Sequence, residues 1–138
     1  MLPALLPALL RGLPVGVQPI SGVLRLRVAV HLVINARTDA FYTTSGPTDE
    51  KLAESIRRGN SYAEAGADCV FVQPVWERQL ISTLVKEIDA PLNILANPGI
   101  GGGMPPSVSE LQELGVARVS LGSGVMKATL ALVKKVAD

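Results

Sequence analysis

The stretch HLVINARTDAF, residues 31–41, decides how this chain is interpreted, because a short apolar run passes directly into polar and charged residues. The run Leu32–Ala36 is rich in Leu, Val and Ile, which predicts a buried strand of a parallel sheet. Asn35, Arg37 and Asp39 alternate along the chain, so in an extended segment their side chains share one face. We expect these three residues to lie at the carboxyl end of the strand.

The same pattern of a short apolar run followed by a longer amphipathic stretch occurs four times. The other three runs are Cys69–Gln73, Leu92–Ala96 and Ala117–Leu121. Helices are expected at 48–65, at 76–88, after the capping box Ser107–Glu110, and at 124–137. Thr48 is the expected N-cap of the helix at 48–65, and Gly66 is expected to end it. Gly115 is expected to end the helix that follows the capping box.

Strands that alternate with helices over short connections predict a parallel sheet with right-handed crossovers, covered on both faces. Four such βα units fit either half of an eight-fold barrel or a small open α/β sheet. A complete barrel needs about 250 residues, and this chain has 138. Both architectures place ligands at the carboxyl ends of the strands.

Composition narrows the functional classes. A net charge of +1 and an aromatic content of 4% give no support for a nucleic-acid partner. The single cysteine, Cys69, and the single histidine, His31, exclude a Cys/His zinc site and are interpreted as structural. A lone cysteine is typical of a reducing, cytoplasmic setting. No apolar run is long enough to cross a membrane.

The first thirty residues differ from the rest of the chain. They are apolar, interrupted by prolines and free of Asp and Glu. We interpret 1–30 as a leader of irregular structure and 31–138 as the folded domain. A lack of acidic residues is also typical of organelle transit peptides, which is the alternative interpretation of this segment.

Polar residues follow each predicted strand and form a candidate ligand site. The planar guanidinium of Arg37 suits a carboxylate or phosphate, although it could instead pair with Asp39 and only tie down the strand end. Gln73 follows the second strand as a neutral hydrogen-bonding group or a rim residue. Asn97 follows the third strand and precedes the glycines 101–103, which would form either a cover for the site or a flexible insertion.

The fourth strand leads through Gly122, Ser123 and Gly124 into the last helix. Free backbone N–H groups at such a turn can hold an anion, and the alternative is a tight turn with an N-cap. The sequence contains no nucleophile beside a base and no carboxylate cluster with the spacing of metal ligands. We therefore assign no catalytic residue and no metal ligand from the sequence.

Four motifs, VINARTDAF, RRGNSYAEAGADCVFV, APLNILANPG and ELQELGVARVSLGSG, occur in an order that resembles the isocitrate lyase and phosphoenolpyruvate phosphonomutase superfamily. Within it the chain is most similar to the branch called carboxyvinyl-carboxyphosphonate phosphorylmutase-like. The resemblance runs from about residue 32 to the last residue. It implies that the four strands correspond to strands 5–8 of a (β/α)8 barrel.

The resemblance also implies a chemistry. Members of the superfamily bind Mg²⁺ and make or break C–C or P–C bonds of small 2-oxo or 2-hydroxy acids through an enolate. The arginine of the ART motif, here Arg37, binds the substrate carboxylate in the family, and the ILAN asparagine, here Asn97, contacts substrate. The position of Gln73 holds a glutamate in the methylisocitrate lyase branch, and the segment PGIGGGMPP replaces a threonine-containing one.

The family's metal ligands are acidic residues of earlier strands, and residues 1–30 contain none. We therefore expect a truncated lyase or mutase that does not hold Mg²⁺ alone. An inactive module for interaction or small-anion binding is the alternative, and an unrelated phosphate-binding α/β domain is a third. A half barrel exposes strand edges and a sheet face, so we expect a homo-oligomer or pairing with a barrel-completing chain. The expected ligand is a small carboxylate or phosphonate.

Overall fold

The computed structural model describes residues 32–97 and 104–138. The predicted leader, His31 and the glycines 101–103 lie outside the described residues. The element order is β1 (Asn35–Thr38), α3 (Ala40–Thr43), α4 (Thr48–Glu64), β2 (Cys69–Val72), α5 (Arg78–Glu87), β3 (Leu92–Leu95), α6 (Val108–Glu113), β4 (Arg118–Ser120) and α7 (Gly124–Ala137).

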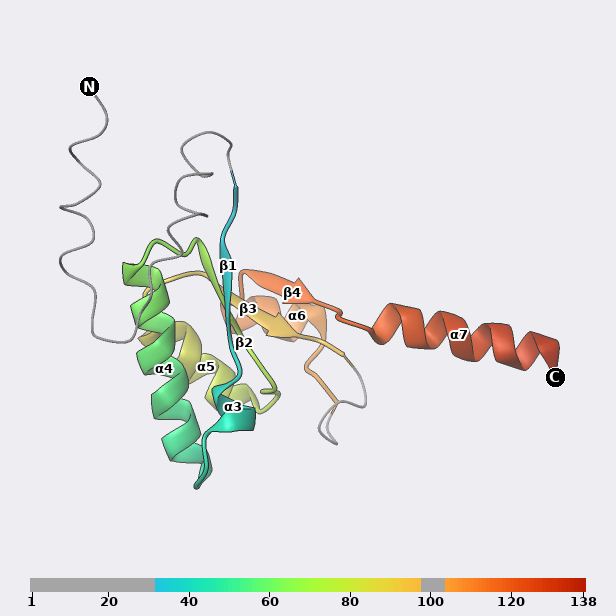
Figure 1. Cartoon of the computed structure of the whole chain (residues 1–138), viewed down its shortest axis with the longest axis horizontal. Coiled ribbons are helices and arrows are strands. Elements are labelled where there is room, and N and C mark those ends of the chain that lie inside the picture. The colour runs from blue at the N-terminus through green and yellow to red at the C-terminus, as the bar shows by residue number, and fades with distance from the viewer. Residues whose placement is uncertain (1–31, 98–103) are drawn as a thin grey trace.

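The strands form one sheet in which neighbours along the chain are neighbours in space. Its order is β1-β2-β3-β4 and every pairing is parallel, as the βα pattern predicts (Figure 1). Asn35 is in register with Cys69, and Asn93 is in register with both Phe71 and Arg118. This parallel four-stranded α/β arrangement is the one expected for part of an eight-stranded barrel.

The hydrophobic core lies between the sheet and the helices α4, α5 and α6. Ile81, Leu84 and Ile88 form the buried stripe of α5 and its end. They pack with Leu111 of α6 and with the strand residues Val70, Val72, Leu92 and Ile94. Burial of this apolar surface is the main stabilising term for the domain.

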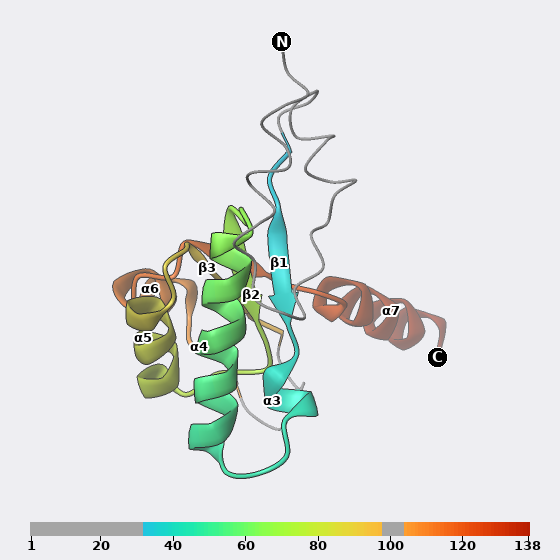
Figure 2. The same ribbon diagram turned by 60° about the vertical axis from the view of Figure 1, so that its left-hand side comes forward.

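The opposite face of the sheet differs from the expectation of cover on both sides. Figure 2 shows α4, α5 and α6 on one side of the sheet and α7 on the other, where it extends away. Because side chains alternate along a strand, the face away from the core carries Asn35, Arg37, Phe71, Asn93 and Arg118. By the same alternation this face also carries Cys69, Leu95 and Ser120, so it mixes polar and apolar side chains.

Strand β1 begins three residues later than predicted, at Asn35 instead of Leu32. Leu32 and Val33 are exposed, and the Asp68 carboxylate accepts a hydrogen bond from the Ile34 N–H at 2.8 Å. Pairing with β2 therefore starts only at Asn35. Arg37 consequently lies within the strand, and Asp39 is the first residue beyond it.

Helix boundaries follow local chain chemistry. Ser107 and Glu110 form the predicted capping box of α6, since each side chain accepts a bond from the other residue's backbone N–H. Gly66 and Gly115 have φ values of 95° and 87°, the left-handed conformation in which glycine ends a helix. The predicted N-cap of α4 was wrong by one residue, because Pro47 is the N-cap and Thr48 is already helical.

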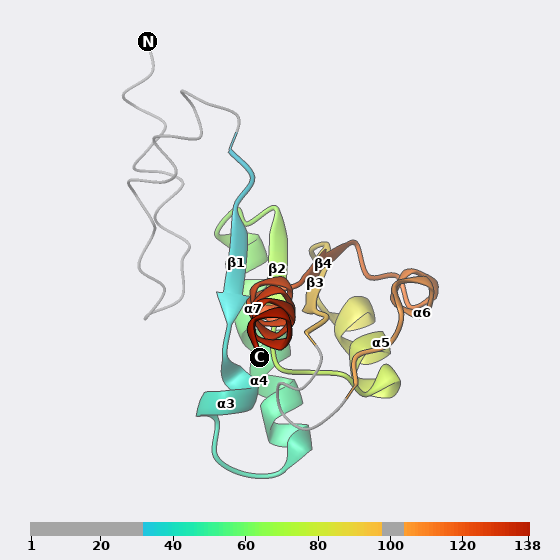
Figure 3. The same ribbon diagram turned by 90° about the vertical axis from the view of Figure 1, so that its right-hand side faces the viewer.

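The last helix is the least integrated element. α7 spans the predicted residues 124–137 but buries none of its side chains. Figure 3, viewed almost along its axis, shows α7 in front of the sheet, with α4 behind. Its large apolar side chains are exposed; they are Val125, Met126, Leu130, Leu132, Val133 and Val136. No helix in the described part of the chain is long and apolar enough to cross a membrane.

Candidate functional site

Three predicted site residues meet where β1 and β2 end. The Nε of Arg37 donates a hydrogen bond to Oδ1 of Asp39 at 2.7 Å. The Nε2 of Gln73 donates to the same oxygen at 3.3 Å. Arg37 and Gln73 come from neighbouring strands, so a single carboxylate oxygen joins the two strand ends. The pairing of Arg37 with Asp39, which we considered as an alternative to ligand binding, is thus present.

The Arg37 guanidinium stays accessible in spite of this pairing. Its side chain is 53% exposed, and that of Asp39 is 39% exposed. The Nη groups of Arg37 have no hydrogen-bond partner among residues 32–97 and 104–138. Arg37 lowers the pKa of the Asp39 carboxyl below its ordinary value by hydrogen bonding, with a smaller contribution from Gln73. Asp39 is therefore an anion at neutral pH, and the local pair is electrically balanced.

The segment after β2 is fixed to the neighbouring strand by a tryptophan that we did not predict as part of the site. The indole N–H of Trp76 donates to the Leu95 carbonyl at the end of β3, at 3.2 Å. Gln73 itself is buried. The contact holds the chain that carries Gln73 against the sheet, and a tryptophan just beyond an apolar run was the only sequence signal for it.

Asn97 and the turn after β4 form a second group at the carboxyl ends of the strands. Asn97 is 1% exposed. A Cβ placed on Gly124 would lie 2.5 Å from Asn97 Oδ1, and one on Gly122 would lie 3.6 Å from its Nδ2. The Nδ2 group is buried without a hydrogen-bond partner in the described structure. The absence of a side chain at Gly124 thus makes room for Asn97, whereas a Cβ on Gly122 would be in ordinary van der Waals contact with it. The sequence did not indicate this fit.

The remaining predicted residues are placed differently. Asn35 is at the amino-terminal start of β1, not at its carboxyl end as we expected, because the strand is shifted along the chain. Its Oδ1 is buried without a partner in the part of the chain that the structure describes. Ser123 occupies the N-cap position of α7, and its side chain makes no capping hydrogen bond.

A polar pair on the sheet face away from the core was not predicted. Asn93 Nδ2 donates to Ser120 Oγ at 3.0 Å, and the Ser120 hydroxyl lies 3.2 Å from Asn93 Oδ1. Asn93 is completely buried although it lies within an apolar run. Cys69 is a buried free thiol, and burial raises its pKa, as expected for a structural residue.

The described residues do not fit a magnesium site. Mg²⁺ prefers a shell of carboxylate and water oxygens. Within 32–97 and 104–138, no group of three or more His, Cys, Asp or Glu side chains lies together to hold a metal ion. Asp39, the acidic side chain at this site, is already shared by Arg37 and Gln73. What the described arrangement offers a ligand is therefore the exposed Arg37 guanidinium, with the Gln73 amide bonded to the same carboxylate.

Comparison with known proteins agrees with the resemblance of the motifs. An uncharacterised protein of Mycobacterium tuberculosis is 36% identical over 90 residues, 65% of this chain and 31% of that protein. A 2-methylisocitrate lyase of Halalkalibacterium halodurans is 39% identical over 71 residues, 51% of this chain and 21% of the enzyme. The chain thus spans about a third or less of these curated relatives.

Solved structures share the fold. A candidate phosphonomutase from Burkholderia cenocepacia J2315 is 36% identical, with a TM-score of 0.63 over 79% of this chain and 44% of that one. A 2,3-dimethylmalate lyase, a member of the PEP mutase/isocitrate lyase superfamily, matches with a TM-score of 0.69 and 22% identity, over 83% of this chain and 38% of that one.

The family model described as phosphoenolpyruvate phosphomutase matches residues 17–138. The match includes β1 to β4 and begins within the segment that we separated as a leader, whose structure lies outside the described residues. It covers well over half of the chain and agrees with the solved relatives. The chain therefore belongs to the phosphoenolpyruvate phosphomutase family, within the PEP mutase/isocitrate lyase superfamily.

Proposed function

We propose that this chain is the substrate-anion-binding half of a lyase or mutase barrel. Its ligand is a small 2-oxo or 2-hydroxy acid or phosphonate, whose C–C or P–C bond breaks through an enolate in the assembled enzyme. The names of its relatives support this class, since they include a lyase and a candidate phosphonomutase. In this proposal β1 to β4 take the places of strands 5–8 of a (β/α)8 barrel.

The half-exposed Arg37 carries the proposal. A guanidinium presents parallel N–H donors that match the two oxygens of a carboxylate. Arg37 already uses Nε for Asp39, and its Nη groups are available to a ligand. A carboxylate held there would keep its charge neutralised while negative charge develops on the adjacent carbon. Gln73 and Asn97, at the ends of β2 and β3, add neutral amide groups around the ligand.

The Mg²⁺ of the parent chemistry has no fitting ligand set among the described residues. The contribution that we assign to this chain is accordingly the binding and orientation of the anionic group. Ligands for the metal would have to come from a barrel-completing chain or from residues outside those described.

An inactive interaction module is the second candidate, and α7 favours it. Its apolar side chains have no cover within the described chain. Helices with such exposed apolar surface in a small protein mark association sites. We propose that the chain pairs with a second copy or with a barrel-completing chain, with or without turnover.

Turnover and binding assays separate the two candidates. Small 2-oxo and 2-hydroxy acids are offered with added Mg²⁺, and binding of oxalate is measured by calorimetry. Arg37→Ala should abolish turnover and binding. Arg57→Ala is the matched control, because Arg57 also bonds a carboxylate through Nε at 2.7 Å and its side chain is 64% exposed.

Each outcome has a separate meaning. Turnover that requires both Mg²⁺ and Arg37 supports the enzyme proposal. Oxalate binding without turnover supports the inactive anion-binding module. Turnover without Mg²⁺, or turnover that Arg37→Ala leaves intact, contradicts the proposed chemistry.

A further inference from the structure

Asp39 lies at a position where its carboxylate would be expected to cap a helix, but the carboxylate does not do so. Asp39 is the N-cap residue of α3, a position where Asp typically bonds the backbone N–H groups of the first turn. Its side chain makes no capping bond. The Asp39 carbonyl accepts from Thr43 N at 3.0 Å, the ordinary first bond of the helix, and also from Tyr42 N at 2.8 Å, a donor that a capping side chain could have bonded.

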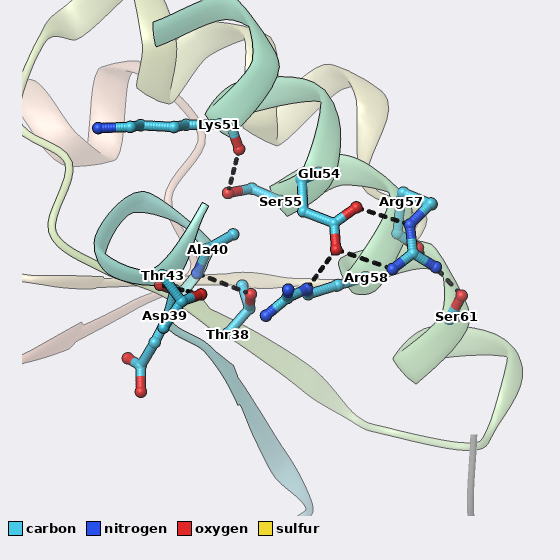
Figure 4. Close-up of polar contacts among 10 residues, drawn as sticks. All are labelled: Thr38, Asp39, Ala40, Thr43, Lys51, Glu54, Ser55, Arg57, Arg58 and Ser61. Atoms are coloured by element: carbon cyan, nitrogen blue, oxygen red, sulfur yellow. Dashed lines mark hydrogen bonds and ion pairs between the residues drawn. The ribbon is translucent and has the colours of Figure 1, made fainter. Parts of the chain in front are cut away.

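The carboxylate points away from its own helix. Figure 4 shows it directed away from Ala40 and Thr43, while the Thr43 hydroxyl bonds the Asp39 main-chain oxygen at 3.1 Å. The N–H of Ala40, the first residue of α3, donates to Thr38 Oγ1 at 3.3 Å, so it too has a partner other than the Asp39 carboxylate. The carboxylate of Asp39 is thereby left for Arg37 and Gln73.

The atom of Arg37 that bonds Asp39 also bears on the role of this pair. Asp39 meets the guanidinium at Nε and leaves the two Nη groups without a partner in the described part of the chain. A carboxylate whose task was only to neutralise Arg37 gains most from a bidentate contact, which occupies an Nη group as well. A bond through Nε alone leaves both Nη groups of Arg37 accessible to a ligand.

We propose that Asp39 is a positioning residue, which holds Arg37 by its Nε, braced by Gln73, so that both Nη groups are presented to the carboxylate or phosphonate of the ligand. This inference rests on the proposed function, in which Arg37 binds the anion. A long arginine side chain loses rotamer freedom when it binds, and a side chain already fixed in the free protein avoids part of that cost.

Substitution of Asp39 distinguishes positioning from simple charge competition by the sign of its effect. Asp39→Ala removes both the negative charge and the hydrogen bond. If Asp39 positions Arg37, we expect oxalate to bind about three- to tenfold more weakly to this variant. If Asp39 only competes with the ligand for Arg37, the same variant should bind oxalate more tightly, which would overturn the proposal.

Asp39→Asn is the conservative variant, because it keeps an acceptor oxygen and removes the charge. We expect it to bind oxalate at least as well as Asp39→Ala and close to the unmodified protein. Glu54→Ala is the matched control. Glu54 also accepts from arginine Nε groups, those of Arg57 and Arg58, at 2.7 and 2.6 Å, and it should leave oxalate affinity unchanged.

A second readout is independent of ligand. The side-chain Nε–H signal of Arg37 is assigned in NMR spectra of the free protein by its loss in Arg37→Lys. Asp39→Ala should shift this signal and speed its exchange with water, whereas Glu54→Ala should not. If oxalate does not bind the unmodified protein, the proposed function fails, and the Nε–H signal still decides the inference: an unchanged signal in Asp39→Ala overturns it.

Discussion

The amide oxygen of Asn97 lies 2.5 Å from the point that a Cβ on Gly124 would occupy, so the end of β3 and the start of α7 fit together only because residue 124 has no side chain. This close approach joins two residues that the sequence predicted for the candidate site. Residue 124 is a glycine because of this close packing, and no special backbone conformation is needed to account for it.

Gly124→Ala should therefore destabilise the protein, by about 1–3 kcal/mol, because the added methyl group must displace a buried amide. Urea denaturation measures the loss. In the double variant Gly124→Ala/Asn97→Ala the cost should be smaller than the sum of the single effects, because the clash no longer exists. Strict additivity would show that the two residues do not touch in solution.

Loss of the α6 cap should be measurable in the same assay. Ser107→Ala removes the side-chain half of the capping box with Glu110 and should cost about 1 kcal/mol of unfolding free energy. Ser109→Ala, two residues further along the chain and without a capping role, is the control and should change stability by less than about 0.5 kcal/mol. Equal effects at both positions would contradict the role of the cap.

The arginine pair on α4 predicts a dependence of stability on pH. Hydrogen bonds from Arg57, the larger contribution, and from Arg58 lower the pKa of Glu54 from 4.5 to about 2. A depressed carboxyl pKa stabilises the folded state above the unfolded pKa, and this contribution is lost as the pH falls from 4.5 towards 2.

Glu54→Gln should accordingly be less stable than the unmodified protein at pH 7, by up to about 1 kcal/mol because the pairs are near the surface. The difference should shrink when urea denaturation is repeated near pH 3. Glu113→Gln is the control, since its side chain is 72% exposed and only 4.0 Å from Arg78. A difference that does not depend on pH would argue against the ion pairs as its source.

The exposed face of α7 predicts self-association. Leu130→Lys/Val133→Lys should shift the protein from dimer to monomer in analytical ultracentrifugation, because charged side chains oppose burial of that face. Lys134→Ala, on the same helix, should leave the oligomeric state unchanged. A monodisperse monomer with cooperative thermal unfolding before any substitution would contradict the expected pairing.

Much of the fold could be predicted from local signals. Strands β2 and β3 begin at the predicted Cys69 and Leu92, and β4 lies within the predicted run, because dense Val, Ile and Leu mark strands buried in a core. The capping box at Ser107 is similarly local. The start of β1 was missed because Asp68, thirty-four residues away, takes the Ile34 N–H.

The candidate site was predictable only in part, since its contacts depend on sheet register. Arg37 and Asp39 are two residues apart, so their pairing could be considered from the sequence. The link to Gln73 requires β1 and β2 to lie side by side with Arg37 opposite Phe71. The fit of Asn97 against Gly124 requires the same knowledge for β3 and β4, and hydrophobic patterns do not contain it.

The separation of α7 from the core makes its helical state conditional. A helix of 14 residues is marginal in water unless packing supports it, and here no side chain of the helix is buried by the described chain. Its folding is therefore expected to be coupled to whatever covers it. If a second copy covers α7, far-ultraviolet circular dichroism should show helical content that rises with protein concentration. The last tenth of the chain would then report association of the molecule.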